Sequence, residues 1–89
     1  MMLFMLLMAY EESISHMACA KAIQCDIFNT SEQDSCINCV DNFLEDHAGT
    51  VNFFGKNFIK DKINNYTCQQ TMKAAKEHEI YKCVRGNNG

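Results

Sequence analysis

Apolar side chains recur at intervals of three and four residues over much of the chain, the spacing that places them on one face of an α-helix. Residues 36–48 carry one such face and residues 50–66 carry a second, which Gly55 weakens without necessarily breaking. Residues 13–25 and 71–84 show the same spacing less regularly. The alternation typical of a half-buried strand extends over only a few positions. We therefore predict an all-α fold, a small bundle of four to five helices.

Breaks in this pattern divide a single domain into four parts. Residues 1–25 are an apolar N-terminal helical segment that ends in Cys-x5-Cys, and residues 26–35 have the polar composition of a linker loop. Residues 36–84 form a helical hairpin and a last helix, and residues 85–89 form a flexible tail. A chain of 89 residues is too short for a second hydrophobic core, so one domain is expected.

Residues 1–10 (MMLFMLLMAY) are an apolar run with three interpretations. The run is a buried helix of the domain, a degenerate signal peptide without the usual basic leader, or a short anchor at a membrane interface. It has about half of the roughly 20 residues that a helix needs to cross a bilayer. Cleavage at the small residues around Cys19 would discard one cysteine and leave five. We favour the buried helix.

The chain contains six cysteines, several times the ordinary usage. A core this small commonly needs covalent cross-links, so we expect three disulfides that staple the helices together. Disulfides imply an oxidising compartment, and we expect a secreted protein or one in a lysosomal or vesicular lumen. Six cysteines allow fifteen pairings. Cys36 and Cys39 lie three residues apart on one helix face, so both can reach a single neighbouring helix.

Other uses of the cysteines are weaker. A strong zinc motif needs two Cys-x2-Cys knuckles, and this chain has one Cys-x2-Cys and one Cys-x5-Cys. A thioredoxin-like redox motif needs a βαβ context, which the pattern does not predict. No nucleophile with its base and no converging pair of carboxylates is recognisable. We expect a protein that is not an enzyme and that has no metal or other cofactor.

Composition and charge narrow the range of partners. The chain is 47% hydrophobic and 21% charged, which is too apolar for intrinsic disorder. Eight basic residues against eleven acidic ones give a net charge of −3. The long-range field of such a protein repels a polyanion, so nucleic acid is not an expected partner.

Two stretches of the chain carry a resemblance to a known family. Residues 36–45, followed by residues 59–68, resemble the first half of saposin-like domains, including amoebapores, with a Cys-x2-Cys opening and 28 residues before the next cysteine. Residues 6–25 are similar to the closing segment of that family, an apolar helix and an acidic stretch followed by Cys-x5-Cys. Here the closing segment comes first, as in the permuted saposin-like inserts of plant aspartic proteases. The resemblance covers most of the chain in swapped order.

The resemblance implies a saposin-like bundle with a definite disulfide framework. Carried over to this chain, the framework pairs Cys25 with Cys36, Cys19 with Cys39 and Cys68 with Cys83. It also implies helices that open like a clasp and expose apolar inner faces to acyl chains. The stretch between the last two cysteines is long for the family, and the leading helix looks truncated. Residues 53–56, leading to the fifth cysteine, are also similar to a family of secreted cysteine-rich nematode proteins.

The amphipathic helices carry more apolar residues than one small core obviously needs, and surplus apolar faces can bind lipid. The lipid-facing candidates are Val40, Phe43, Leu44, Val51, Phe54, Phe58, Ile59 and Ile63. Each can equally be a core residue. We expect a lipid-binding, membrane-interacting protein whose partners are lipids or a membrane surface, with a membrane-perturbing antimicrobial or cytolytic role as one form of this function. A homodimer is considered as well. The alternative is a secreted disulfide-rich toxin, signal or inhibitor that acts on a protein receptor.

Two N-x-[ST] sequons begin at Asn29 and Asn65. Such sequons are glycosylation acceptors where a eukaryotic cell secretes the chain. We therefore name both asparagines as glycosylation candidates.

Overall fold

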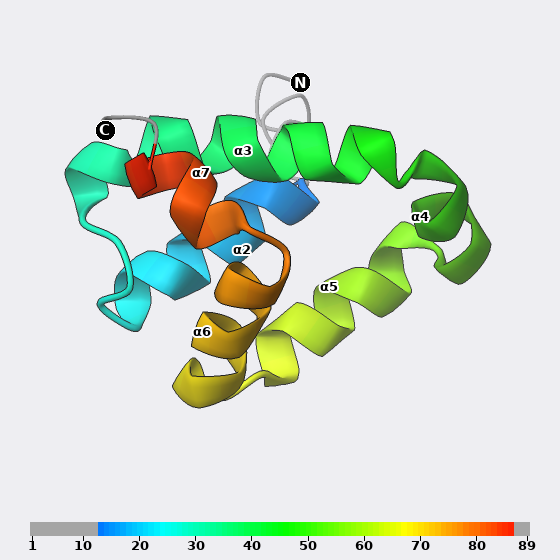
Figure 1. Cartoon of the computed structure of the whole chain (residues 1–89). Coiled ribbons are helices and arrows are strands. Elements are labelled where there is room, and N and C mark those ends of the chain that lie inside the picture. The colour runs from blue at the N-terminus through cyan, green and yellow to red at the C-terminus, as the bar shows by residue number, and fades with distance from the viewer. Residues whose placement is uncertain (1–12, 87–89) are drawn as a thin grey trace, which may run out of the picture.

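The computed structural model describes residues 13–86, and this part of the chain is helical throughout apart from short connections (Figure 1). Six α-helices and one 3-10 turn follow one another along these described residues. They are α2 (Ile14–Gln24), the 3-10 turn η1 (Thr30–Glu32), α3 (Gln33–Asp46), α4 (Ala48–Phe54), α5 (Lys56–Asn65), α6 (Cys68–Glu77) and α7 (Ile80–Gly86). The prediction of a small all-α bundle is confirmed, with more helices than the four to five expected. The interpretations of residues 1–10 lie outside the described residues.

Helix α2 is the centre of the bundle. It packs against α3, α5 and α6, while α7 lies along α3 and α4 joins the far ends of α3 and α5 (Figure 1). The buried residues of α2 are mostly small, with Ser15, Cys19 and Ala22 among them. Small side chains let neighbouring helices approach closely, which explains how a helix of 11 residues contacts three others.

Local signals set several helix boundaries. The Ser13 hydroxyl accepts a hydrogen bond from the His16 amide and caps α2. Thr67 and Gln70 form a capping box at the start of α6, with bonds of 2.8 and 3.1 Å. Gly55, at φ 90°, ends α4 and begins α5, so the helix expected over residues 50–66 is broken there. Only glycine adopts this φ without strain.

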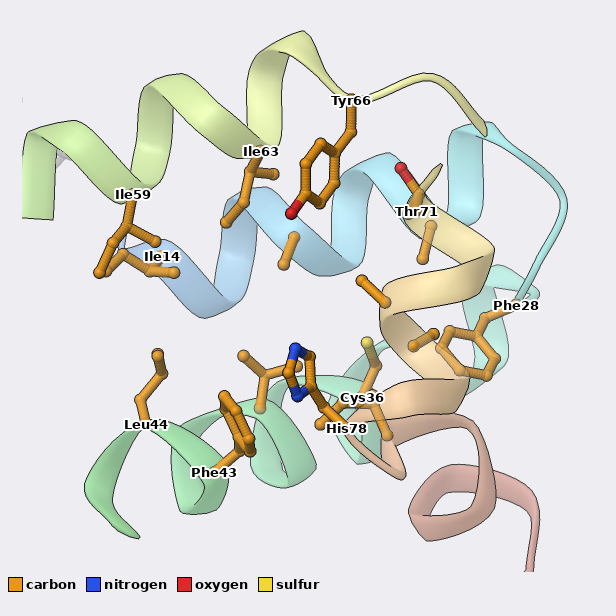
Figure 2. Close-up of a pocket in the computed structure, with 16 residues that line it drawn as sticks. Ile14, Phe28, Cys36, Phe43, Leu44, Ile59, Ile63, Tyr66, Thr71 and His78 are labelled. Atoms are coloured by element: carbon orange, nitrogen blue, oxygen red, sulfur yellow. The ribbon is translucent and has the colours of Figure 1, made fainter. Parts of the chain in front are cut away.

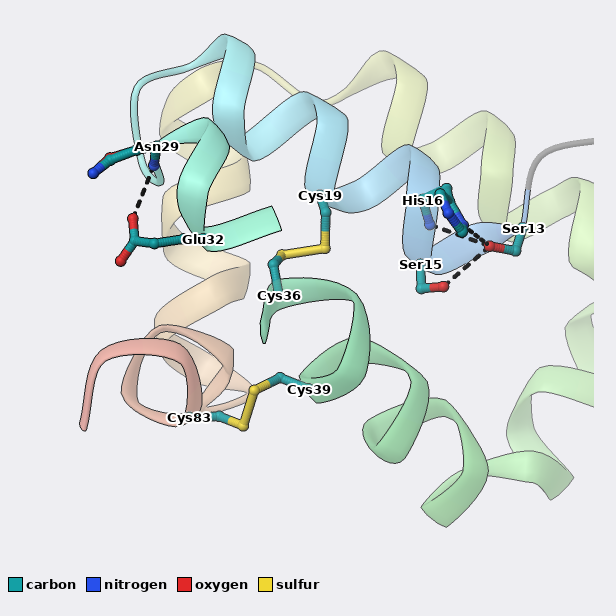
Figure 3. The surroundings of a disulfide bond; sticks show 9 residues. All are labelled: Ser13, Ser15, His16, Cys19, Asn29, Glu32, Cys36, Cys39 and Cys83. Carbon is teal, nitrogen blue, oxygen red and sulfur yellow. Dashed lines mark hydrogen bonds between the residues drawn. A yellow bond between two sulfur atoms is a disulfide. The ribbon is translucent and has the colours of Figure 1, made fainter. Parts of the chain in front are cut away.

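Three disulfides join the helices, and all six cysteines are paired; Figure 3 shows two of these bonds, Cys19–Cys36 and Cys39–Cys83. Cys19–Cys36 links α2 to α3, Cys25–Cys68 links the end of α2 to the start of α6, and Cys39–Cys83 links α3 to α7. The expectation of a disulfide-stapled bundle is confirmed. These bonds also support an oxidising, secreted-type environment for the protein.

The structure contradicts all three pairings that the family resemblance implies, namely Cys19–Cys39, Cys25–Cys36 and Cys68–Cys83. Cys36 and Cys39 do not reach a single helix, because α2 and α7 both pack against α3 and each receives one of them. Cys68 is the first residue of α6, a helix about 15 Å long, and α7 follows the other end of that helix. Cys68 is therefore next to Cys25 rather than Cys83.

The hydrophobic core is small, and cysteine side chains make up a large part of it. Its buried members are Cys19, Ala22, Ile27, Phe28, Cys36, Cys39, Val40 and Val84. Two of the three disulfides therefore cross the core itself. A core with so few large side chains leaves much of the stability to the cross-links.

The predicted linker, residues 26–35, differs from expectation because part of it enters the core. Ile27 and Phe28 are 4% and 3% exposed, and the Ile27 amide donates to the Ala22 carbonyl over 2.8 Å. The rest of the segment forms η1 and the first turn of α3, which begins at Gln33. The segment is polar in composition because its other residues face solvent.

The predicted flexible tail, residues 85–89, is wrong at its first two positions. Arg85 and Gly86 belong to α7, and Arg85 holds the segment before α3 in place. Its guanidinium forms an ion pair with Glu32 at 2.9 Å and donates to the Ile27 carbonyl over 3.0 Å. It also lies 5.6 Å above the Phe28 ring and 5.1 Å above the Tyr81 ring. Residues 87–89 lie outside the described part of the chain.

The ion pair predicts a contribution to acid stability. A side-chain hydrogen bond from Arg85, and next a backbone one from Asn29, hold the pKa of Glu32 below its ordinary value of 4.5. A carboxyl whose pKa is lowered by folding contributes stability above its ordinary pKa, and this is lost as pH falls through the folded value. We expect Glu32→Gln to lower the melting temperature at neutral pH and to lose less stability than the wild type below about pH 4.5.

Melting curves from neutral to acid pH measure this difference. Glu77→Gln, a change of the same charge at an exposed position on α6, is the control and should follow the wild type. Equal acid sensitivity in all three proteins would contradict the prediction.

Candidate functional site

A cavity of about 210 Å³ lies between α2, α3, α5 and α6 (Figure 2). Its walls are apolar at all but three of the residues that line it. The lining residues are Ile14, Ala18, Ala22, Phe28, Cys36, Val40, Phe43, Leu44, Ile59, Ile63, Tyr66, Thr71, Ala74, Ala75, His78 and Ile80. The space is partly open to solvent, so it is a deep apolar pocket of the bundle and not an enclosed void.

Each wall of the cavity comes from one helix face. Ile59 and Ile63 of α5 face Phe43 and Leu44 of α3 across the space, and both pairs point inward (Figure 2). α2 supplies mostly small side chains, including Ala18, so the cavity extends up to its backbone. The spacing of four between the two isoleucines places them on one face of α5, as the sequence pattern predicts.

The structure brings five of the eight lipid-facing candidates together. Val40, Phe43, Leu44, Ile59 and Ile63 all line the cavity. Val40 is also a buried residue of the core.

The other three candidates lie elsewhere. Val51 borders a polar, open groove on another side of α3, next to Asn38 and Asp41. Phe54 and Phe58 are 49% and 50% exposed at the corner between α4 and α5. Gly55 turns the chain between α4 and α5, and neither helix has a buried residue, so these two rings stay exposed.

Sequence reasoning missed the α6 wall of the cavity. Thr71, Ala75 and His78 line it at positions i, i+4 and i+7, which is a regular helical face. Two of the three are polar, so a search for hydrophobic periodicity passes over them. The spacing of small and polar residues along residues 71–78 is the signal that could have found this wall.

Three polar side chains border the cavity. The Thr71 hydroxyl donates to the Thr67 carbonyl within α6 over 2.9 Å, so it is already engaged. The Tyr66 hydroxyl and the His78 ring both point toward the cavity, from the α5 and α6 sides (Figure 2). They are the groups placed to meet the polar end of a bound molecule.

An aromatic stack forms the cavity wall next to His78. The Phe43 ring lies 4.8 Å from the His78 ring and 4.2 Å from the His47 ring, measured between centroids. The His47 Nδ1 group donates to the Phe43 carbonyl over 2.8 Å, which holds the outer ring of the stack in place. Contacts between rings at these distances fix the position of Phe43 at the edge of the cavity.

No protein-family model, curated protein or solved structure matches this chain. Its function is therefore inferred from its own residues. Between residues 13 and 86, no helix combines the length and the apolarity needed to cross a membrane. Over the same range, no three or more His, Cys, Asp or Glu residues gather in a way that could hold a metal ion. With every cysteine in a disulfide, no thiolate is left for the zinc site considered from the sequence.

Both predicted glycosylation candidates lie on the surface. Asn29 is exposed, and its backbone amide donates to the Glu32 carboxylate over 2.8 Å (Figure 3). Asn65 is the exposed last residue of α5. Neither position lines the cavity, so a glycan at either one leaves the cavity walls unchanged. Glycosylation itself stays a prediction.

Proposed function

We propose that this protein binds a single fatty acyl chain in the cavity between α2, α3, α5 and α6. The observation that carries the proposal is the apolar lining of a space of about 210 Å³ at the centre of the bundle. An alkyl chain covers apolar walls that otherwise face solvent, and its own apolar surface leaves water.

The polar groups at the cavity indicate which kind of acyl ligand is preferred. The Tyr66 phenol and the His78 imidazole can each donate a hydrogen bond to a carboxylate. Tyr66 follows the end of α5 and His78 follows the end of α6. The isoleucines of α5 and Phe43 of α3 supply hydrocarbon walls. A fatty acid, with an apolar tail and a small anionic head, meets both requirements. We therefore favour a fatty acid over a plain hydrocarbon.

The disulfide pattern supports a cavity that can widen. The bonds connect α2, α3, α6 and α7, and no disulfide ends on α4 or α5. The arm between Cys39 and Cys68 is therefore held by non-covalent contacts, mainly those of α5 with α2, where the Lys21 ammonium group also donates to the Asn64 carbonyl over 2.9 Å. Ligand pockets usually measure about 300–1,000 Å³. Movement of α5 away from α3 would let a long acyl chain occupy more than the space seen here.

We place this activity in a secreted protein or in a lysosomal or vesicular lumen, because three disulfides persist in such compartments. Lipid carriage and membrane perturbation, including an antimicrobial or cytolytic role, are uses that such a cavity would serve. The resemblance to saposin-like domains adds no support, since none of the disulfides it implies is present. A secreted toxin, signal or inhibitor with a protein receptor would not need the cavity.

Filling the cavity tests the proposal. Ala74 lines the cavity from α6, and Ala74→Leu places three more carbon atoms in or at the edge of that space. We expect at least about a tenfold loss of affinity for a fluorescent long-chain fatty acid, because the new side chain occupies the site of the ligand. Stability should be unchanged or higher, since the added carbons fill part of this apolar pocket.

Ala20→Leu is the matched control, because Ala20 is an exposed residue of α2 that does not line the cavity. This variant should bind like the wild type. Fatty acid binding that Ala74→Leu leaves intact, or a wild type that binds no fatty acid, would refute the proposed function and leave the receptor-directed alternative.

A further inference from the structure

We propose that the corner between α4 and α5 is the surface by which this protein docks on an anionic lipid bilayer. Phe53, Phe54 and Phe58 enter the boundary between head groups and acyl chains, and Lys56 and Lys62 contact lipid phosphates. The proposal deepens the proposed function and rests on it for the choice of a lipid partner. It assigns a surface, distinct from the cavity, that the experiment below tests separately.

The corner carries a continuous group of exposed aromatic rings. Phe53 is 82% exposed, and Phe54 and Phe58 are 49% and 50% exposed. The Phe53 and Phe54 rings meet edge to face at 5.2 Å, and the Phe54 and Phe58 rings stack at 5.3 Å. Single exposed apolar residues are ordinary, but three adjoining aromatic rings form a patch of the kind that binds a partner or a membrane.

The backbone brings these rings together at one end of the molecule. α4 and α5 have no buried residues, and α4 packs mainly against α5 and the end of α3. Gly55, at φ 90°, turns the chain between the two helices, so that Phe54 and Phe58 lie on the same outer side. In Figure 1 the corner is at the far right, away from α6 and α7. Nothing in the described part of the chain covers it.

Charge favours an anionic membrane as the occupant of this surface. Residues 48–65 contain Lys56, Lys60 and Lys62 but only one acidic residue, Asp61. The rest of the chain holds five of the eight basic residues and ten of the eleven acidic ones. Residues 48–65, which include the aromatic corner, thus carry two net positive charges in a protein whose net charge is −3. An anionic surface attracts this corner and repels the remainder, which sets the orientation of docking.

Lysines next to exposed aromatic rings suit docking on a bilayer better than docking on a flat protein surface. A lysine can extend its charged end to the phosphates while its hydrocarbon part lies in the apolar layer. α5 also connects the two surfaces, because Phe58 faces outward and its neighbour Ile59 lines the cavity. A docked corner therefore places the movable wall of the cavity at the bilayer surface.

Vesicle co-sedimentation of the full chain tests this surface. The vesicles are phosphatidylcholine, alone or with about 30% phosphatidylserine, the anionic lipid that attracts basic segments. We expect the wild type to bind only the anionic vesicles, and the triple variant Phe53→Ser, Phe54→Ser, Phe58→Ser to lose at least about tenfold in partitioning. All three side chains are about half exposed or more, so the fold should persist, as melting curves will verify.

Charge reversal supplies the matched control. Lys56→Glu with Lys62→Glu should weaken binding to anionic vesicles severalfold. Lys73→Glu with Lys82→Glu changes the net charge equally, at exposed positions on α6 and α7, and should have a much smaller effect. Equal losses in both pairs would overturn the proposal, because binding would then follow total charge and not the corner. Wild-type protein that binds no anionic vesicle would also overturn it.

Two further outcomes distinguish membrane docking from fatty acid binding in the cavity and from dimerisation through the corner. The triple phenylalanine variant should still bind fatty acid in solution, and Ala74→Leu should still bind anionic vesicles. If the wild type is a dimer in solution and the triple variant a monomer, the corner is an interface between two copies of the chain and the membrane proposal is wrong. A failure of fatty acid binding alone refutes only the cavity.

Discussion

Replacement of both Cys39 and Cys83 by alanine is expected to lower the free energy of unfolding by about 3–4 kcal/mol. The two residues are 44 positions apart, and the entropy of closing such a loop corresponds to about 4 kcal/mol. The Cys25–Cys68 bond interleaves with this one and already shortens the open loop, which brings the expected loss slightly below that figure. Since a domain of this size has a total stability of roughly 5–13 kcal/mol, the variant should be marginal.

Urea denaturation followed by circular dichroism measures this loss. The Cys25–Cys68 pair, 43 positions apart, closes a loop of nearly the same size, so alanine at both positions should cost a similar amount. Reduction of all three bonds should leave the chain largely unfolded. A loss below about 1 kcal/mol in the Cys39 and Cys83 variant would show that this disulfide does not hold the fold together.

A peptide mass map without reduction checks the pairing directly. We expect linked peptides that contain Cys19 with Cys36, Cys25 with Cys68, and Cys39 with Cys83. Detection of Cys25 with Cys36 and Cys19 with Cys39 would restore the framework that the saposin-like resemblance implies and would contradict the fold described here.

Truncation of Phe28 to alanine is expected to cost about 3–5 kcal/mol, the range for a buried phenylalanine. The residue is 3% exposed and packs in the core. Its ring lies 5.7 Å from the Tyr81 ring and under the guanidinium of Arg85. Removal of the ring therefore opens a void in the core and removes one of the contacts between α7 and the segment before α3. The cost should be much larger than for any exposed phenylalanine of this chain.

Phe53→Ala is the matched control, because this ring is 82% exposed. The free energy of unfolding should change by no more than about 0.5 kcal/mol in this variant. Urea denaturation of both variants under the same conditions gives the comparison. If Phe28→Ala is as stable as Phe53→Ala, the segment that contains Phe28 is the mobile polar linker that its composition suggests.

The positions of the helices were largely predictable because the signals for a helix are local. The regular apolar spacing of residues 36–48 predicted most of α3, which begins three residues earlier, at Gln33. Gly55 was recognised as a weak point, but its φ of 90° makes it a full break. The division of the last segment into α6 and α7 was not predicted. It occurs where Glu79 adopts a φ of 62°, a conformation that no sequence pattern at this position signals.

The candidate site was predictable only in part. The aliphatic and aromatic residues of α3 and α5 were recognised from their spacing, but a spacing cannot tell which face meets a cavity and which meets solvent. Ile59 lines the cavity and its neighbour Phe58 is exposed, although both belong to the same apolar pattern. Tyr66 and His78 were missed because their part in the site depends on the helices that face them.

The sequence by itself determined that this chain is helical, that it is one domain, and that its six cysteines form disulfides. These properties depend on composition and on interactions within a few residues. Only the tertiary structure decided which cysteines pair, where Ile27 and Phe28 lie, and how four helices enclose a cavity. Each of these depends on contacts between distant residues, such as Arg85 with the Ile27 carbonyl, 58 positions away. Such contacts depend on how all the helices pack together, and a pattern of a few neighbouring residues does not contain that information.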